Sequence, residues 1–315
     1  MVKNHPPHAQ PPKIIFIAGP TAAGKSFVAF ELAQKLQSEI VSCDAMQVYK
    51  EMTISSDKAS TEMRKTVPHH LLDVCSVEAP FSVARYRELA LAAIKDILSR
   101  GKIPVVVGGS GMYMMALLDG IFEYGELSPD IREKLKGELE AEGLGALYER
   151  LSQVDPEAAK KIAPTDAFRI TRALEVFEGT GEKISELQKK RDGLWGKYDI
   201  RIFGLTRGRD ELYRRVEARI DEMFDKGLVE EVRAVLKKKM TLNAARLIGV
   251  PEVQGFLEGG YDLDRAKYLM KLNTRHYVKR QMTWFRKDQR IEWLTMGNSE
   301  TLEEIVRKII SALNH

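Results

Sequence analysis

Hydrophobic residues occur along the chain in two patterns, short continuous runs and runs at helical spacing. The continuous runs predict strands at residues 14–18, 39–42 and 103–107, and the third is apolar almost throughout, as in a strand buried on both faces of a parallel sheet. After the first strand, apolar residues recur every four positions and predict a helix over residues 26–37. Strands that alternate with helices in this way indicate an α/β fold.

The pattern changes near residue 125. Apolar residues then recur at helical spacing, first at Ile131 and Leu135 and again at Ile170 and Leu174, with no run typical of a strand between them. A strand pattern returns at 199–205, after which helical periodicity continues almost to the end and includes an apolar stripe over residues 302–313. We therefore expect a disordered tail over residues 1–12, a core domain over 13–124 and 198–315, and a helical insertion over 125–197.

Composition and charge exclude few classes of function. The formal net charge of +4 is too small to identify a nucleic-acid-binding protein by itself. The two cysteines, Cys43 and Cys75, are far apart and lack metal-ligand spacing, so neither a disulfide framework nor a zinc site is expected. No apolar run approaches the roughly 20 residues that span a bilayer. We expect a soluble, cytoplasmic monomer without a membrane partner.

The strongest motif matches the phosphate-binding loop GxxxxGK[ST], and it lies between a predicted strand and a predicted helix. Its residues are Gly19, Pro20, Thr21, Ala22, Ala23, Gly24, Lys25 and Ser26. The glycines let backbone N–H groups wrap an anion, Lys25 neutralises phosphate oxygens, and Ser26 is suited to bind Mg²⁺. Kinases, nucleotide hydrolases and transferases that expel diphosphate all use such a loop, so the loop alone does not identify the reaction.

Acidic residues near this loop narrow the choice. A nucleotide hydrolase would carry a magnesium-binding acid after a second strand, but the strand at 103–107 is followed by Gly-Gly-Ser-Gly at 108–111. Asp73 is a weaker candidate for such an acid, and a structural role fits it equally well. Asp44 directly follows the strand at 39–42, where parallel sheets bind ligands. A carboxylate there suits a general base, and the capping of a turn is the alternative.

Six motifs in order resemble those of the bacterial tRNA dimethylallyltransferase family, and the resemblance covers residues 14–293. They are the phosphate loop, residues 44–49, 69–73, 107–113, 169–175 with Thr180-Gly181, and 274–285. The resemblance implies a P-loop NTPase-like parallel sheet with a helical insertion. It also implies that dimethylallyl diphosphate places its diphosphate in the loop with Mg²⁺, and that N6 of the adenosine 3′ of the anticodon attacks the allylic carbon.

The resemblance also implies roles for individual residues. Asp44 would be the general base, Thr21 and Arg215 would steady the diphosphate, and Ser26 would be the magnesium ligand. Ser110 takes the place of a family threonine that approaches the RNA. The implied contacts with the anticodon stem-loop of tRNA are Asp44, Ala45, Met46, Gln47, Ser110, Phe168, Arg169, Ile170, Thr171, Arg172, Arg275, Lys279 and Arg280.

Residues 271–290 form a basic segment with seven Lys or Arg and one Asp, interleaved with Tyr277, Trp284 and Phe285. Basic side chains suit RNA phosphates, and aromatic faces suit unpaired bases. A solvated helix with a few buried aromatic residues is the alternative. Gln47 is a candidate for reading the displaced base or its neighbour.

Two stretches depart from the family pattern. Where the family usually has Asp-Ile-Gly-Thr-Ala-Lys, residues 53–58 read Thr-Ile-Ser-Ser-Asp-Lys, so Ser55 replaces a glycine and Asp57 adds a negative charge near the expected anion site. Where the family has Ile-Gly-Tyr-Lys-Glu, residues 248–252 read Ile-Gly-Val-Pro-Glu, without the aromatic residue and the cation.

Other functions therefore stay open at this point. One is a P-loop small-molecule kinase that binds ATP in the loop and uses Asp44 to activate a hydroxyl. A second is a catalytically impaired, RNA-binding homologue, which the intact Lys25, Ser26 and Asp44 disfavour. A prenyltransferase acting on free adenine nucleotides would share the loop chemistry but would have little need for the basic segment at 271–290.

Overall fold

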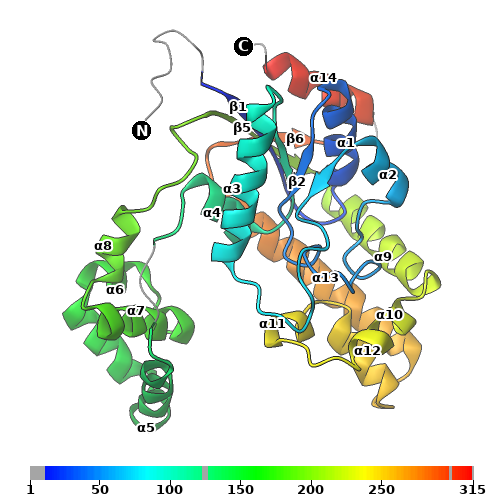
Figure 1. Ribbon diagram of the computed structural model, residues 1–315. Coiled ribbons are helices and arrows are strands. Elements are labelled where there is room, and N and C mark those ends of the chain that lie inside the picture. Colours follow the sequence, from blue (N-terminus) through cyan, green and yellow to red (C-terminus); the bar gives the residue numbers. More distant parts are fainter. Residues whose placement is uncertain (1–10, 123–126, 298–299, 314–315) are drawn as a thin grey trace. The chain divides into compact units, whose positions relative to one another are not determined.

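The computed structural model describes residues 11–122, 127–297 and 300–313, which fall into two compact units (Figure 1). Unit 1 comprises the described residues up to Leu118 and from Trp195 onwards, and unit 2 lies within Asp119–Leu194. The insertion thus begins earlier and ends slightly earlier than the predicted range of 125–197. The predicted tail lies mostly outside the described residues.

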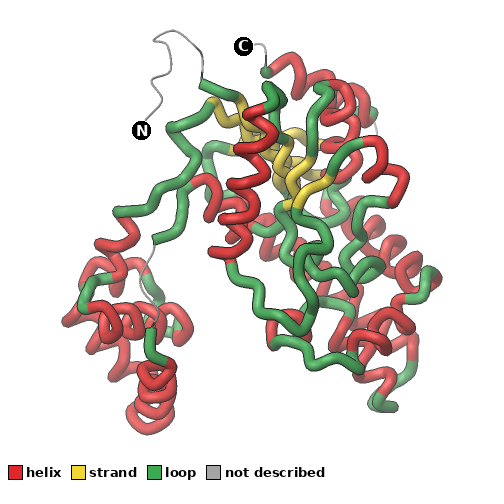
Figure 2. Tube along the Cα trace, viewed as in Figure 1, coloured by secondary structure: helices red, strands yellow, loops and turns green. Residues whose placement is uncertain are grey.

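Unit 1 contains a six-stranded sheet with the order β3-β2-β4-β1-β5-β6, and all neighbouring strands are parallel. The strands are β1 Lys13–Ala18, β2 Ile40–Ser42, β3 His69–His70, β4 Val105–Val107, β5 Asp199–Thr206 and β6 Ile291–Thr295. Figure 2 shows these strands side by side within unit 1. The sheet confirms the predicted α/β class, with the strand before the phosphate loop at an inner position.

Helices complete unit 1, and several begin at side chains that cap them. The Ser82 side chain accepts a hydrogen bond from the Arg85 amide at the start of α3, and Thr301 and Glu304 form a capping box at α14. Among the described residues, no helix is both long and apolar enough to cross a membrane. The helices of unit 1 are α1 Lys25–Lys35, α2 Thr61–Thr66, α3 Val83–Ser99, α4 Gly111–Leu118, α9 Arg209–Asp225, α10 Leu228–Val235, α11 Leu242–Ala245, α12 Val250–Leu257, α13 Leu263–Phe285 and α14 Leu302–Ala312.

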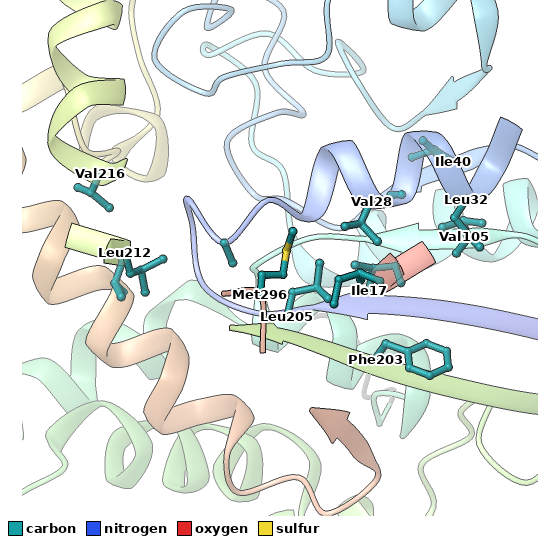
Figure 3. Packing of buried hydrophobic residues seen from close by; sticks show 14 of the residues in the cluster. Ile17, Val28, Leu32, Ile40, Val105, Phe203, Leu205, Leu212, Val216 and Met296 are labelled. Atoms are coloured by element: carbon teal, nitrogen blue, oxygen red, sulfur yellow. The ribbon is translucent and has the colours of Figure 1, made fainter. Parts of the chain in front are cut away.

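The core of unit 1 is built on both faces of β1. Ile15 and Ile17 belong to a buried cluster with residues of α1 and α14. Side chains alternate along a strand, so Ile14 and Phe16, which are also fully buried, face the other side of the sheet. Figure 3 shows Ile17 near Val28 of α1 within this cluster. Burial on both faces explains why this strand reads as a continuous apolar run.

Unit 2 is helical and has a core of its own, to which Leu135, Leu151, Ile170 and Leu174 contribute. The apolar spacing seen in the sequence therefore marks helix faces that pack together within this unit. The first helix changes direction at Gly143, where φ is 81°. The helices are α5 Pro129–Val154, α6 Pro156–Lys161, α7 Ala167–Thr180 and α8 Ile184–Lys189.

Three strands differ from the prediction: two were not predicted, and one is shorter than predicted. Strand β6 interrupts the stretch after residue 205 that was predicted to be helical, because an edge strand with few buried residues has little periodicity of its own. Strand β4 is shorter than the predicted 103–107, and it begins after Pro104, which has no N–H to donate. Strand β3 consists of His69 and His70 alone, too short and too polar for a pattern to reveal.

Candidate active site

The loops that follow β1, β2, β4 and β5 meet at one edge of the sheet, because parallel strands end on the same side. They are joined there by residues of α9 and α13 around a cavity of about 470 Å³. Residues with candidate chemistry at the cavity wall are Thr21, Lys25, Ser26, Asp44, Arg215 and Tyr277. Four separate parts of the sequence thus contribute to one site.

The phosphate loop makes a tight turn from β1 into the N-terminus of α1. Gly19 has φ 132°, and a Cβ there would lie 2.3 Å from the carbonyl oxygen of Leu205. Ala22 and Gly24 also have positive φ, 63° and 101°, and α1 begins at the next residue, Lys25. The loop therefore presents a helix N-terminus, whose backbone N–H groups favour an anion.

Lys25 places a desolvated cation in the cavity. Its Nζ donates a hydrogen bond to the carbonyl oxygen of Pro20 at 2.7 Å. Burial lowers the pKa of Lys25 from 10.5 to about 8; the Asp44 carboxylate opposes this shift, and the positive charge of Arg219 adds to it. The charged form of Lys25 is therefore destabilised by its burial, and a bound anion would stabilise it, as expected of a phosphate-binding lysine.

Asp44 is anchored by its own backbone turn. Its Oδ1 accepts a hydrogen bond from the Met46 amide at 2.9 Å, which is the turn-capping role considered as the alternative. An ionised carboxylate offers about four acceptor positions, so this bond orients the group and leaves capacity for a substrate proton. Asp44 also lines the cavity and interacts electrostatically with Lys25. Turn capping and a general-base role are therefore compatible.

Arginines following β5 hold the outer side of the phosphate loop. Arg215 Nε donates to the carbonyl oxygen of Ala22 at 3.0 Å, and Arg207 Nε donates to that of Ala23 at 3.2 Å. Burial lowers the pKa of Arg215, and the charge of Arg207 lowers it further. Arg215 thus lies in the cavity wall and against the phosphate loop.

Gln281 was not predicted, and it braces two loops of the site. Its Oε1 accepts from the Thr21 amide at 2.9 Å, and its Nε2 donates to the carbonyl oxygen of Gly109 at 2.9 Å. The side chain is only 5% exposed. Helix α13 therefore ties the phosphate loop to the loop after β4, although Gln281 lies 260 residues from Thr21 in the chain.

Replacing Gln281 by leucine should destabilise unit 1. It would leave the Thr21 amide and the Gly109 carbonyl without their partner, at about 1–3 kcal/mol for each buried group. Urea unfolding would measure this loss. The matched control is Gln254→Leu, because the Gln254 side chain on α12 donates to Glu258, the residue that caps this helix, and to neither loop. Equal stability of the two variants would show that the brace does not hold the loops together.

The Gly-Gly-Ser-Gly sequence after β4 reflects close packing. A Cβ at Gly108 would lie 1.9 Å from the carbonyl oxygen of Cys43, and one at Gly111 would lie 2.3 Å from the Trp284 ring. Ser110 Oγ accepts a hydrogen bond from the Ala45 amide at 2.9 Å. This serine therefore fastens the segment that carries Asp44, a role that the sequence did not indicate.

Gln47 also has a bracing role. Its Oε1 accepts from Ser42 Oγ at 2.9 Å, and its Nε2 donates to the carbonyl oxygens of Ser56 and Asp57 at 3.3 and 3.4 Å. The side chain thus joins β2 to the segment 53–58. Reading a base would require Gln47 to exchange these bonds.

The departure at Ser55 leaves the local backbone undistorted. Ser55 has an ordinary negative φ, so the position does not require glycine. The amides of Thr53, Ile54 and Ser55 all donate to the carboxylate of Glu231, at 2.7–2.9 Å. A serine at this position is therefore compatible with the backbone conformation of the segment.

Two charged residues of the segment 53–58 form ion pairs. Asp57 has φ 50° and pairs with Arg219 of α9 at 3.1 Å. Lys58 pairs with Asp73 at 2.7 Å, and Asp73 also pairs with Arg64 at 2.7 Å. Asp73 therefore has the structural role that was one of its two interpretations.

The departure at 248–252 is also accommodated. Gly249 has φ 105° and precedes α12, and its amide donates to Glu252 Oε2 at 2.7 Å. Pro251 lies in the first turn of this helix, where a missing N–H costs nothing. Val250 is fully buried, so it belongs to the core.

The basic segment at 271–290 is mostly α13. Lys279 and Arg280 are exposed, whereas Arg275 pairs with Glu217 at 3.1 Å. Trp284 is 39% exposed, but Phe285 is buried in the core. Phe285 therefore matches the alternative of a buried aromatic residue, and the helix combines this residue with the exposed Lys279 and Arg280.

Among the implied tRNA contacts in unit 2, Phe168 is 78% exposed, while Ile170 is fully buried. A contact through the Ile170 side chain is excluded in this arrangement, because the side chain packs in the core of the unit. Thr171 Oγ1 donates to the Ala167 carbonyl oxygen at 2.8 Å. Arg169 pairs with Asp166, and Arg172 pairs with Glu175.

The residues of the loop suit magnesium bound together with phosphate. Among the described residues, no cluster of three or more His, Cys, Asp or Glu could hold a metal alone. Ser26 is exposed and lines the cavity. Mg²⁺ commonly takes one or two protein oxygens and fills its remaining positions with water and phosphate oxygens, an arrangement that Ser26 fits.

Strand β1 lies inside a parallel sheet that is flanked by helices, and the phosphate loop connects it to α1. This arrangement defines a P-loop NTPase-like protein. A family model described as IPP transferase matches residues 47–288. The chain belongs to this family.

Two relatives and two solved structures illustrate the similarity. The chain is 42% identical over 302 residues to a tRNA dimethylallyltransferase of Carboxydothermus hydrogenoformans, covering 95% of this chain and 96% of the relative. It is 45% identical over 289 residues to tRNA dimethylallyltransferase 2 of Geotalea uraniireducens, covering 91% and 93%. The structure of a tRNA isopentenylpyrophosphate transferase from Bacillus halodurans matches with a TM-score of 0.70 at 35% identity, covering 96% and 97% of the two chains. A eukaryotic dimethylallyltransferase acting on tRNA matches with a TM-score of 0.82 at 29% identity, covering 96% of this chain and 79% of that one.

Proposed function

We propose that the protein transfers a dimethylallyl group from dimethylallyl diphosphate to N6 of the adenosine 3′ of the anticodon in tRNA, releasing diphosphate. Family membership supports this reaction. The observation that carries it is the meeting of Lys25 and Asp44 in one cavity, a phosphate-binding cation beside an anchored carboxylate. The kinase alternative has no specific observation in its favour.

The diphosphate would be held by the phosphate loop. The amides at the N-terminus of α1, the Lys25 ammonium and the Arg215 guanidinium all offer hydrogen bonds to its oxygens. Mg²⁺ bound with Ser26 would neutralise part of the negative charge that develops on the leaving group. The loop would thus stabilise a departing diphosphate, and no phosphoryl group would be transferred.

The chemical step would form one bond and break another. The lone pair of N6 attacks the allylic carbon, the C–O bond to the diphosphate breaks, and the diphosphate leaves with that electron pair. The exocyclic amine becomes positively charged as the new N–C bond forms, so one of its protons must be removed. Asp44 would accept this proton, because its carboxylate is oriented in the cavity by the Met46 amide.

The anticodon stem-loop of tRNA would be bound by basic and aromatic side chains. In unit 1 the exposed Lys279 and Arg280 suit phosphates, and the half-exposed Trp284 suits an unpaired base. In unit 2 the exposed Phe168 offers a further stacking surface. The adenosine must leave its stack to reach the cavity, at a cost of a few kcal/mol.

Label transfer would test the proposal. The protein is incubated with Mg²⁺, labelled dimethylallyl diphosphate and unmodified tRNA, with AMP and ATP as alternative acceptors. We expect label in tRNA at the adenosine 3′ of the anticodon. Label in AMP alone, or ATP hydrolysis without prenyl transfer, would refute the proposal, and tRNA binding without transfer would indicate an impaired homologue.

The affinity for diphosphate should fall at alkaline pH. The pKa of Lys25 is lowered to about 8, so its positive charge is present below that pH and is lost as the pH rises through it. Binding above pH 8 then requires proton uptake, which weakens affinity by up to about tenfold per pH unit. Calorimetric titration with inorganic diphosphate at several pH values would measure this. Lys25→Met provides the control, because its remaining pH dependence comes from the ligand, and identical profiles would refute the role of Lys25.

A further inference from the structure

Asp57 and Arg219 form an ion pair in the wall of the cavity. Arg219 Nη1 lies 3.1 Å from Asp57 Oδ2, and both residues line the cavity together with Lys25. The pair joins the segment 53–58 to α9. The Asp57 side chain is 52% exposed and that of Arg219 is 28% exposed, so the carboxylate is the more easily solvated partner.

The same wall carries two hydrogen-bonding groups without a partner. Among the described residues, Arg219 Nε and Ser55 Oγ are buried polar atoms that have no hydrogen-bond partner. Leaving such groups unpaired costs free energy, and an oxygen-rich anion would satisfy both. Because Arg219 and Ser55 line the cavity that contains the phosphate loop, the wall is chemically suited to contact a bound diphosphate.

We propose that Asp57 competes with the diphosphate for Arg219 and thereby weakens diphosphate binding and speeds its release as product. This inference rests on the proposed function, because it concerns the same cavity. The guanidinium has five N–H donors, so Arg219 can turn its Nε toward the diphosphate while Asp57 retains part of its charge. Asp57 thus positions Arg219 and thereby sets the affinity for diphosphate.

Electrostatics determines the direction of the effect. The negative charge of Asp57 and the positive charge of Arg219 both act on the Lys25 ammonium, with opposite signs. A diphosphate held at Lys25 would therefore be attracted by Arg219 and repelled by Asp57. The Asp57 charge offsets much of the attraction between Arg219 and the diphosphate. Removing this negative charge should therefore strengthen diphosphate binding.

The test uses Asp57→Asn in the full-length protein. Asparagine tolerates the positive φ at this position and keeps an oxygen that can accept from Arg219, so the variant removes charge and little else. Calorimetric titration with inorganic diphosphate and Mg²⁺ should give a Kd about three- to tenfold lower than for the wild type, with a smaller difference at 1 M salt. Arg219→Gln should instead raise the Kd.

Asp221→Asn is the matched control. Asp221 lies on α9 and pairs with Lys271, so the variant changes the net charge equally but outside the cavity lining. We expect its Kd to equal that of the wild type and all variants to unfold at similar temperatures. An unchanged or raised Kd for Asp57→Asn, or an equal gain in Asp221→Asn, would overturn the inference.

The outcomes separate this inference from the proposed function. If the wild type binds diphosphate and Asp57→Asn does not tighten binding, only the role of Asp57 fails. If the wild type does not bind diphosphate, the proposed function fails with it. In the steady state, Asp57→Asn should lower the KM for dimethylallyl diphosphate and increase inhibition by added diphosphate, a change that a purely structural role would not produce.

Discussion

Replacing Asp44 by asparagine should lower kcat for prenyl transfer by about 100- to 10,000-fold, the range that one general base contributes. Asparagine keeps an oxygen that can accept the hydrogen bond of the Met46 amide, so the turn should survive. What the variant loses is the ability to take the proton from the exocyclic amine. Single-turnover assays with saturating substrates would measure the loss in the chemical step directly.

Binding measurements complete this test. Asp44→Asn should bind inorganic diphosphate at least as tightly as the wild type, because a negative charge near Lys25 has been removed. Asp96→Asn, on the surface of α3, should keep full turnover. Unchanged single-turnover rates in Asp44→Asn would remove Asp44 from the base role and leave it as a turn cap.

The second large effect is expected at Gly108. An alanine Cβ there would lie 1.9 Å from the oxygen and 2.3 Å from the carbon of the Cys43 carbonyl, and backbone atoms cannot move aside as a flexible side chain can. We expect Gly108→Ala to lower the free energy of unfolding by about 3 kcal/mol, at the upper end for an overpacked site. Because Cys43 precedes Asp44, the displaced backbone should also lower turnover.

Gly137→Ala serves as the matched substitution. Gly137 lies within α5, and a Cβ there would meet nothing within 4 Å. Alanine should raise stability by up to about 1 kcal/mol through its higher helix propensity. Urea unfolding of both variants would test the contrast. Equal stability of Gly108→Ala and the wild type would show that the ends of β2 and β4 can separate without cost.

The parts of the fold that could be predicted are those that leave a pattern within a short segment of the sequence. Strand β1 reads as apolar because both of its faces are buried, and the phosphate loop has a fixed spacing next to it. Strands β3 and β6 lie at the edges of the sheet, where short segments with few buried side chains pair through their backbones. Backbone pairing leaves no side-chain pattern, so these strands could not be predicted.

The same distinction applies to the site. Lys25 was recognisable from the loop motif that follows β1, and Asp44 from its position after β2, and parallel strands bring these ends together. Gln281 and Arg219 reach the site from distant helices, and although Gln281 lies within the motif 274–285, nothing in the sequence indicated what either side chain contacts. The sequence showed that Asp57 adds a charge, but only the structure shows that Arg219 is the partner of that charge.

The helical unit leaves and rejoins unit 1 at a single point. The Trp195 amide donates a hydrogen bond to the carbonyl oxygen of Leu118 at 2.9 Å, so the chain ends on either side of the insertion touch. The entropy of closing a loop grows only with the logarithm of its length. The number of residues in the inserted segment can therefore change during evolution with little thermodynamic consequence for the sheet.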